Sequence, residues 1–168
     1  MNSVFSVGQA ADWLANPGEP KDKVANQLRR YRSKGYVQSR GTFGSGPTAT
    51  HTFDAVDLGT AKLCRALTAL GIKDEALMES VSEACYDLPA KGADLGSTPG
   101  MVAALDHPHA GWHLFVFLSD QADGTQRVFA EVHKIEGAQF PEHPAIDAFI
   151  ALPMRQWLPS LAELKAAN

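Results

Sequence analysis

The residues best placed for chemistry follow one face of a segment near the N-terminus. Lys23, Gln27, Arg30 and Lys34 are spaced four, three and four residues apart, so a helix would align them in one polar stripe. Arginine and lysine pair with phosphates or guanine edges, and asparagine and glutamine pair with adenine. Such a helix fits the major groove of DNA, although the same stripe would also suit the solvated face of a small helical bundle.

The candidate DNA-binding residues lie on this helix and on the hairpin expected after it. The hairpin residues would reach the DNA backbone or the minor groove. The helix contributes Lys21, Lys23, Asn26, Gln27, Arg29, Arg30 and Lys34, and the hairpin contributes Arg40, Thr42 and Ser45.

A second group of candidate ligands lies in the C-terminal half. The run from Asp106 to His113 holds three histidines and a carboxylate, and His133 lies on the expected partner strand. Metal sites use such groups, but this spacing fits no helix face and Pro108 interrupts a strand. We interpret these histidines as surface residues and predict no metal or cofactor. Because phosphate loops, nucleophile elbows and His-Glu-x-x-His motifs are also missing from the sequence, we do not expect an enzyme.

The elements around the polar stripe are predicted from apolar spacing. A first helix is expected over residues 6–15, a break at Asn16–Gly18, and a second helix from between Pro20 and Val24 to Gly35. This is the order of a helix-turn-helix motif. The apolar face of the second helix would comprise Val24, Leu28 and Tyr31.

A glycine-rich hairpin is predicted directly after the second helix. Residues 36–53 have strand-like ends at Tyr36-Val37 and Thr50–Phe53, with a glycine-rich loop at 41–47 between them. A hairpin in this position can act as the wing of a winged helix-turn-helix domain.

Two further helices are expected before residue 90. The first would begin at Asp54 or Asp57 and end at Gly71, and the second would end at Pro89. Their buried stripes would comprise Leu63, Leu67 and Leu70 in the first helix, and Leu77, Val81, Ala84, Cys85 and Leu88 in the second.

Beyond a linker-like stretch the pattern changes to strands. Trp112–Leu118 and Arg127–Ile135 flank an Asp-Gly turn and predict a β-hairpin, whose first strand is apolar on both faces and should be covered on both sides or lie at an interface. One or two helices are expected around 144–152 and 155–166.

The predicted fold class is therefore α+β, mainly α. A winged helix-turn-helix domain with a two-helix extension would occupy residues 1–90, a linker residues 91–100, and a small β-hairpin and helix module residues 101–168. That last module would dimerise, sense a ligand or contact a partner.

Charge is also distributed unevenly along the chain. Residues 1–73 carry ten Lys/Arg and five Asp/Glu, a net charge of +5, whereas residues 74–168 carry five and fourteen, a net charge of −9. This asymmetry suggests one polyanion-binding face and one part that stays away from the polyanion, although chance segregation on a solvated surface would look the same.

Composition places the chain among ordinary globular proteins. The hydrophobic fraction is 45% and the charged fraction 20%, and the sequence has neither a membrane-length apolar run nor a secretory signal pattern. We therefore expect a cytoplasmic, nucleoid-associated protein without membrane contact. Cys64 and Cys85 fall on apolar helix faces and are interpreted as buried thiols, with a redox or metal switch as the alternative.

A resemblance to a known family rests on residue order and spacing over residues 3–80. Val7–Ala11, then Leu28–Val37 with its Leu-Arg-Arg-Tyr and Gly-Tyr-Val, resemble the helix-turn-helix pattern of the MerR family of transcriptional regulators. Thr52–Leu58 resembles the family's next helix start, and Leu63–Gly71 resembles the helix that follows.

The resemblance implies a winged helix-turn-helix fold, a homodimer, a palindromic operator and contact with RNA polymerase. It also implies that Arg29 and Tyr31 contact phosphates. MerR-type chains continue into a long dimerisation helix with an effector site, whereas here the fourth helix is expected to stop at Pro89.

Three functions remain open at this stage. The first is a sequence-specific double-stranded DNA-binding transcriptional regulator with an unidentified small-molecule effector. The second is an architectural protein resembling phage excisionases, which would bend DNA without contacting polymerase. The third is a metal- or ligand-sensing interaction module.

Overall fold

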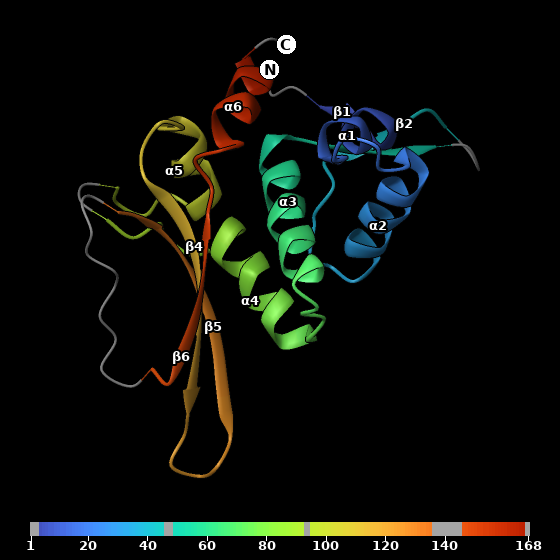
Figure 1. Ribbon diagram of the computed structural model, residues 1–168. Coiled ribbons are helices and arrows are strands. Elements are labelled where there is room, and N and C mark those ends of the chain that lie inside the picture. Colours follow the sequence, from blue (N-terminus) through green and yellow to red (C-terminus); the bar gives the residue numbers. More distant parts are fainter. Residues whose placement is uncertain (1–3, 46–48, 93–94, 136–145, 167–168) are drawn as a thin grey trace.

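The computed structural model is an α+β protein (Figure 1). It describes residues 4–45, 49–92, 95–135 and 146–166.

Two helices near the N-terminus confirm the expected pair. Helix α1 spans Val7–Leu14, and Ser6 caps it in a capping box with Gln9. Helix α2 spans Lys21–Ser33 and ends before Gly35, whose positive φ of 80° suits a residue without a Cβ atom. Both ends are therefore set by local signals.

The residues after α2 differ from the prediction. Tyr36 and Val37 are not a strand end, because both backbone N–H groups donate to the Tyr31 carbonyl and close the end of the helix. Their side chains are buried. These hydrogen bonds satisfy a backbone carbonyl at the end of the helix, and they outweigh the β-propensity of the two residues.

A small antiparallel sheet follows. Strands β2 (Gly41–Phe43) and β3 (Thr50–Phe53) form a hairpin in the expected region, but β2 lies within the stretch 41–47 that was predicted as a loop, so that part of the prediction is wrong. Strand β1 (Phe5–Ser6), which the sequence analysis missed, pairs with β3. The predicted loop residues Gly46 and Pro47 lie outside the described residues.

Helices α3 (Ala55–Ala69) and α4 (Glu75–Tyr86) form the centre of the molecule. Asp54 caps α3, as expected. The predicted burial of Leu70 and Leu88 is wrong, because both lie just past the helix ends and are 62% and 41% exposed.

The C-terminal elements form a second antiparallel sheet with flanking helices. Strands β4 (Trp112–Asp120) and β5 (Gln126–Lys134) confirm the predicted hairpin, and β6 (Ala148–Pro153) completes the order β5-β4-β6. Helix α5 (Gly100–Asp106) was not predicted, and α6 (Leu158–Ala166) confirms the last expected helix.

Strand β6 corrects the helix expected over 144–152. Its residues pair along β4, with Ile150 opposite Val116 and Leu152 opposite Leu114. A short apolar run fits a buried strand or a helix equally well, so the available partner decides between them.

The two halves of the chain share one hydrophobic core. Trp112, Leu114 and Val116 on one face of β4 belong to the same buried cluster as the side chains of α1 to α4. The other face of β4 buries Phe115 and Phe117, so both faces are covered, as predicted.

The segment predicted as a linker is partly structured. The backbone of Lys91 exchanges hydrogen bonds with Val132 and Lys134 of β5, and Gly100 begins α5. Residues 93 and 94 lie outside the described residues. The described parts of residues 101–166 therefore pack on α3 and α4 rather than forming a separate core.

Candidate nucleic-acid interface

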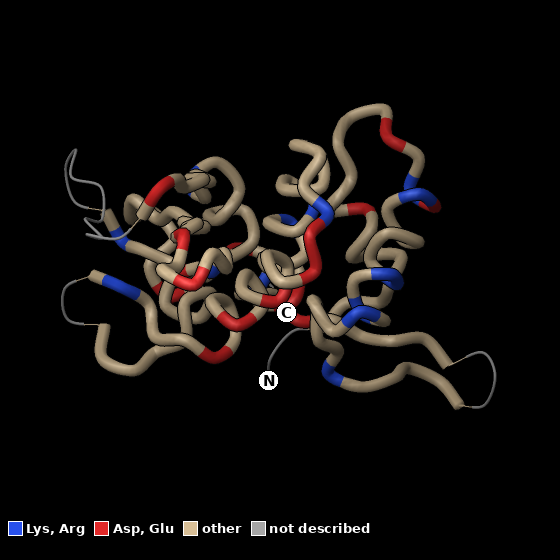
Figure 2. Tube along the Cα trace, turned by 90° about the horizontal axis from the view of Figure 1, so that it is seen from below, with Lys and Arg blue, Asp and Glu red and all other residues tan. Residues whose placement is uncertain are grey.

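Helix α2 presents a polar surface directly opposite its buried side. Val24, Leu28 and Tyr31 are buried, whereas Asn26 and Arg30 on the outer side are exposed. Figure 2 shows several Lys and Arg positions along α2, beside the hairpin β2–β3.

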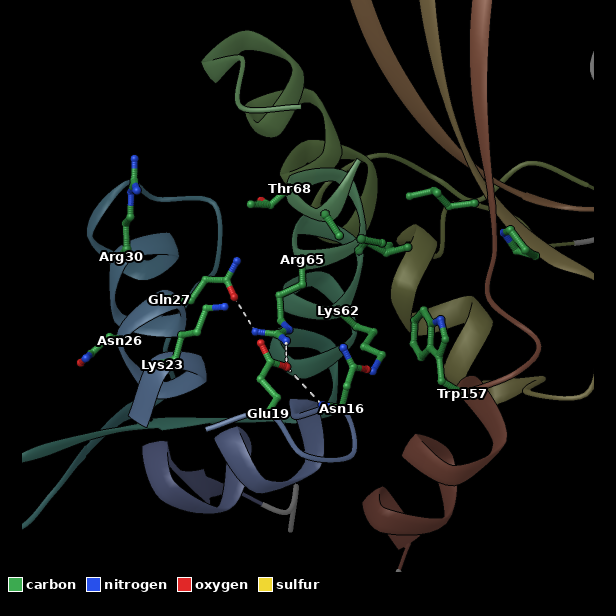
Figure 3. Close-up of a pocket in the computed structure, with 15 residues that line it drawn as sticks. Asn16, Glu19, Lys23, Asn26, Gln27, Arg30, Lys62, Arg65, Thr68 and Trp157 are labelled. Atoms are coloured by element: carbon green, nitrogen blue, oxygen red, sulfur yellow. Dashed lines mark hydrogen bonds and ion pairs between the residues drawn. The ribbon is translucent and has the colours of Figure 1, made fainter. Parts of the chain in front are cut away.

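Part of the predicted stripe turns toward α3 instead of outward. The amide nitrogen of Gln27 donates to the Tyr31 hydroxyl at 2.6 Å, and its amide oxygen accepts a hydrogen bond from Arg65 (Figure 3). The Tyr31 hydroxyl also lies 2.7 Å from Thr68 Oγ1 and donates to the Cys64 carbonyl at 3.2 Å. Burial raises the pKa of Tyr31. The expectation that Gln27 and Tyr31 contact DNA is therefore corrected, because their polar atoms are used within the fold.

Two predicted lysines form exposed ion pairs. Lys21 Nζ lies 2.7 Å from an Asp12 carboxylate oxygen, and Lys34 pairs with Glu75 at the start of α4. These pairs are too exposed to stabilise the fold by much, and each places a carboxylate beside the lysine, which weakens its attraction for a polyanion.

Arg40 is held at the base of the hairpin rather than extended from it. Its Nε lies 2.7 Å from Asp54 and 3.6 Å from Asp57, at the N-terminus of α3. The Tyr86 hydroxyl donates to the Asp57 carboxylate at 2.8 Å. Burial and the neighbouring Asp54 charge raise the pKa of Asp57 to about 7. This network attaches the base of the hairpin to α3 and α4, so Arg40 stabilises the position of the hairpin.

A cationic groove lies between α2 and strand β3. It has a volume of about 590 Å³, and Arg29, Arg30, Arg32 and Ser33 line it from α2. Within the described residues none of these three guanidinium groups forms an ion pair, so all three are free to bind an anion. Arg29 does donate to the Asn26 side chain at 2.8 Å, which orients both groups at the surface.

Sequence reasoning missed two members of this groove. Arg32 was not in the predicted stripe, although it lies in the same run of arginines and its type was a sufficient signal. His51 lies on β3, and its Nδ1 is buried without a hydrogen-bond partner in the part of the chain that is described. Only the pairing of β3 beside α2 brings His51 to the arginines.

The hairpin itself carries the remaining predicted residues. Thr42 and Ser45 are exposed, as a contact with DNA would require. Phe43 between them is 76% exposed and was not predicted, although an aromatic residue in a glycine-rich loop is a usable signal.

The C-terminal histidines do not gather into one site. His133 lies beside Glu131 at 2.7 Å, and His113 lies opposite His133 in the register of β4 and β5. Over the described ranges, no three His, Cys, Asp or Glu side chains come together in a way that could hold a metal ion. Cys64 and Cys85 are buried and free, as predicted.

Comparisons with known proteins add no family. No protein-family model matches the chain, and no curated protein matches it. None of the helices among the described residues combines the length and apolar character needed to cross a membrane.

Proposed function

We propose that this protein is a double-stranded DNA-binding transcriptional regulator of the MerR type. Helices α1 and α2 act as the helix-turn-helix, and the hairpin β2–β3 acts as the wing. The observation that carries the proposal is the groove between α2 and the wing, where Arg29, Arg30 and Arg32 offer three guanidinium groups that have no acidic partner in the described part of the chain. Such groups bind phosphates in bidentate fashion.

The exposed residues of α2 and of the wing have different proposed roles in DNA binding. Asn26 and Arg30 are exposed on the side of α2 opposite its buried residues, where they can reach base edges in the major groove. Arg29 and Arg32 hold the phosphate backbone, and Thr42 and Ser45 approach it from the wing. Residues 91–168 carry five Lys/Arg and nine Asp/Glu, a net charge of −4, which disfavours docking on DNA by that part of the chain.

The test measures binding of the purified protein to duplex DNA by fluorescence anisotropy at several salt concentrations. Log affinity falls with log salt concentration, and each lost phosphate contact makes this fall shallower by about 0.9. Alanine at Arg29, Arg30 and Arg32 together should therefore make it shallower by up to about 2.7. Arg30→Ala alone should cost about 1–3 kcal/mol on a specific site if it reads a base.

Lys21→Ala provides the matched control. Lys21 also lies on α2 but is paired with Asp12, so its removal should change the slope far less. Unchanged binding by the triple arginine variant would exclude this function.

The architectural alternative is favoured by one observation. Helix α4 ends at Tyr86, and the longest described helix is α3 with 15 residues, so the described residues contain no long dimerisation helix. A protein without that helix can bend DNA as a monomer. Sedimentation with and without DNA, together with a bending assay and a transcription assay on the same site, separates this function from that of a dimeric regulator.

A further inference from the structure

A second groove lies on the other side of α2, away from the wing. It is an open groove with a volume of about 710 Å³, lined by α2, by α3, by the turn between α1 and α2, by the end of β6 and by the segment that joins β6 to α6 (Figure 3). Pockets for small organic ligands have volumes of about 300–1,000 Å³ and combine apolar walls with a few polar groups. The size of this groove therefore suits a small molecule.

One wall of the groove is strongly cationic. Lys23, Arg30, Lys62 and Arg65 line it, whereas Glu19 is its single acidic residue. Glu19 is already paired with Arg65, because its Oε2 lies 2.5 Å from Nη2 of the arginine. The side chain of Arg65 is 10% exposed. The groove therefore holds an excess of positive charge that no carboxylate within it balances.

Lys62 is the one of these cations that is partly buried and yet unpaired among the described residues. Its ammonium lies 5.6 Å from the centroid of the Trp13 ring. Burial, with the nearby Arg65 charge, lowers the pKa of Lys62. An anion beside this ammonium would favour its charged form and so oppose this lowering of the pKa.

The opposite wall is apolar. It consists of Leu152 and Pro153 from β6 and of the Trp157 indole, which packs edge-to-face on Trp13 at 6.3 Å. Figure 3 shows Lys62 between Arg65 and Trp157, so the charged and apolar walls meet at this lysine. A ligand that fits both walls has an acidic group at one end and a flat apolar body at the other.

We propose that this groove is an effector site for a small amphipathic organic anion. The acidic group of the ligand lies against Lys62, Lys23 and Arg65, and its apolar body lies against Leu152 and Trp157. The effect on DNA rests on the proposed function. Because Lys23 and Arg30 belong to α2 as well as to this groove, a bound anion neutralises cations that would otherwise attract DNA, and the ligand weakens duplex binding.

The probe is anilinonaphthalene sulfonate, a fluorescent aromatic anion, titrated into the full chain. We expect saturable binding with one site per chain. The neutral N-phenylnaphthylamine has the same aromatic body without the sulfonate, and it should bind at least about tenfold more weakly because it forgoes the charge-assisted contacts. Equal affinity for the two probes, or binding that does not saturate, would overturn the proposal.

Two variants locate the site. Lys62→Gln should weaken the anionic probe by about tenfold and leave the neutral probe unchanged, whereas Trp157→Leu should weaken both. Lys73→Gln is the control, because this exposed lysine lies outside the groove. Circular dichroism checks that each variant is folded. If Lys62→Gln and Trp157→Leu are both folded and bind both probes normally, the site is wrongly placed.

Duplex binding is then measured with and without saturating anionic probe. A rise in the duplex Kd for the wild type, and a smaller rise for Lys62→Gln at the same probe concentration, supports the effector role. Probe binding without any effect on duplex affinity removes that role. Probe binding by a protein that binds no duplex refutes both the proposed function and the effector role, but the anion site itself stands.

Discussion

The Tyr31 hydroxyl gives the sharpest contrast between the family resemblance and the structure. The resemblance implies a phosphate contact, whereas the structure places this hydroxyl in the core between α2 and α3. Tyr31→Phe removes the hydroxyl and keeps the ring. We expect the variant to lose stability and to keep its affinity for duplex DNA.

The expected loss of stability follows from the hydrogen bonds that the partners of the hydroxyl keep in the variant. The hydroxyl has three partners, but Thr68 Oγ1 keeps its hydrogen bond to the Cys64 carbonyl at 2.8 Å, and Gln27 keeps Arg65. No buried polar group is therefore left entirely without a partner, and the cost stays near that of one or two ordinary hydrogen bonds. This gives about 1–2 kcal/mol, or a fall in Tm of about 2–8 °C.

Urea unfolding followed by tryptophan fluorescence measures the stability, and anisotropy measures the duplex affinity. Tyr36→Phe is the matched control, because Tyr36 is a buried neighbour whose hydroxyl makes no hydrogen bond within the described residues. It should shift the free energy of unfolding by less than about 0.5 kcal/mol. A large loss of duplex affinity by Tyr31→Phe with unchanged stability would refute the reasoning.

Three further predictions concern the core. Because burial raises the pKa of Asp57 to about 7, its contribution to folding is full below its ordinary pKa of about 4 and is lost as the pH rises from there through 7. In urea titrations the wild type should therefore lose stability relative to Asp57→Asn between about pH 4 and 7, and parallel curves would contradict this. Gly100→Ala should cost about 1–3 kcal/mol, since a Cβ atom there would overlap the Ala84 carbonyl oxygen, and an unchanged urea midpoint would count against the packing. The thiols of Cys64 and Cys85 should resist the reagent DTNB in the native protein and react in concentrated urea, because both are buried; rapid native reaction would disprove that burial.

Much of the candidate site follows from residue type alone. Arg29, Arg30 and the exposed Thr42 and Ser45 were selected because long cationic side chains and loop residues rarely lie in a core. Gln27 and Tyr31 could not be assigned in this way, because their direction depends on Arg65 and Thr68 on another helix. The anion groove needs Trp157, more than 90 residues further along the chain than Lys62, so no local pattern indicates it.

The sequence by itself determined the elements whose ends carry local signals. Ser6, Asp54, Gly35 and the Asp-Gly turn between β4 and β5 act through neighbouring backbone atoms, so the helices α1 to α4 and the second hairpin could be predicted. Only the tertiary structure decided that residues 148–153 form a strand and that the two halves share one core. Those outcomes depend on the distant surface against which an apolar segment packs. The free energy gained by this packing is larger than the segment's local preference for helix or strand.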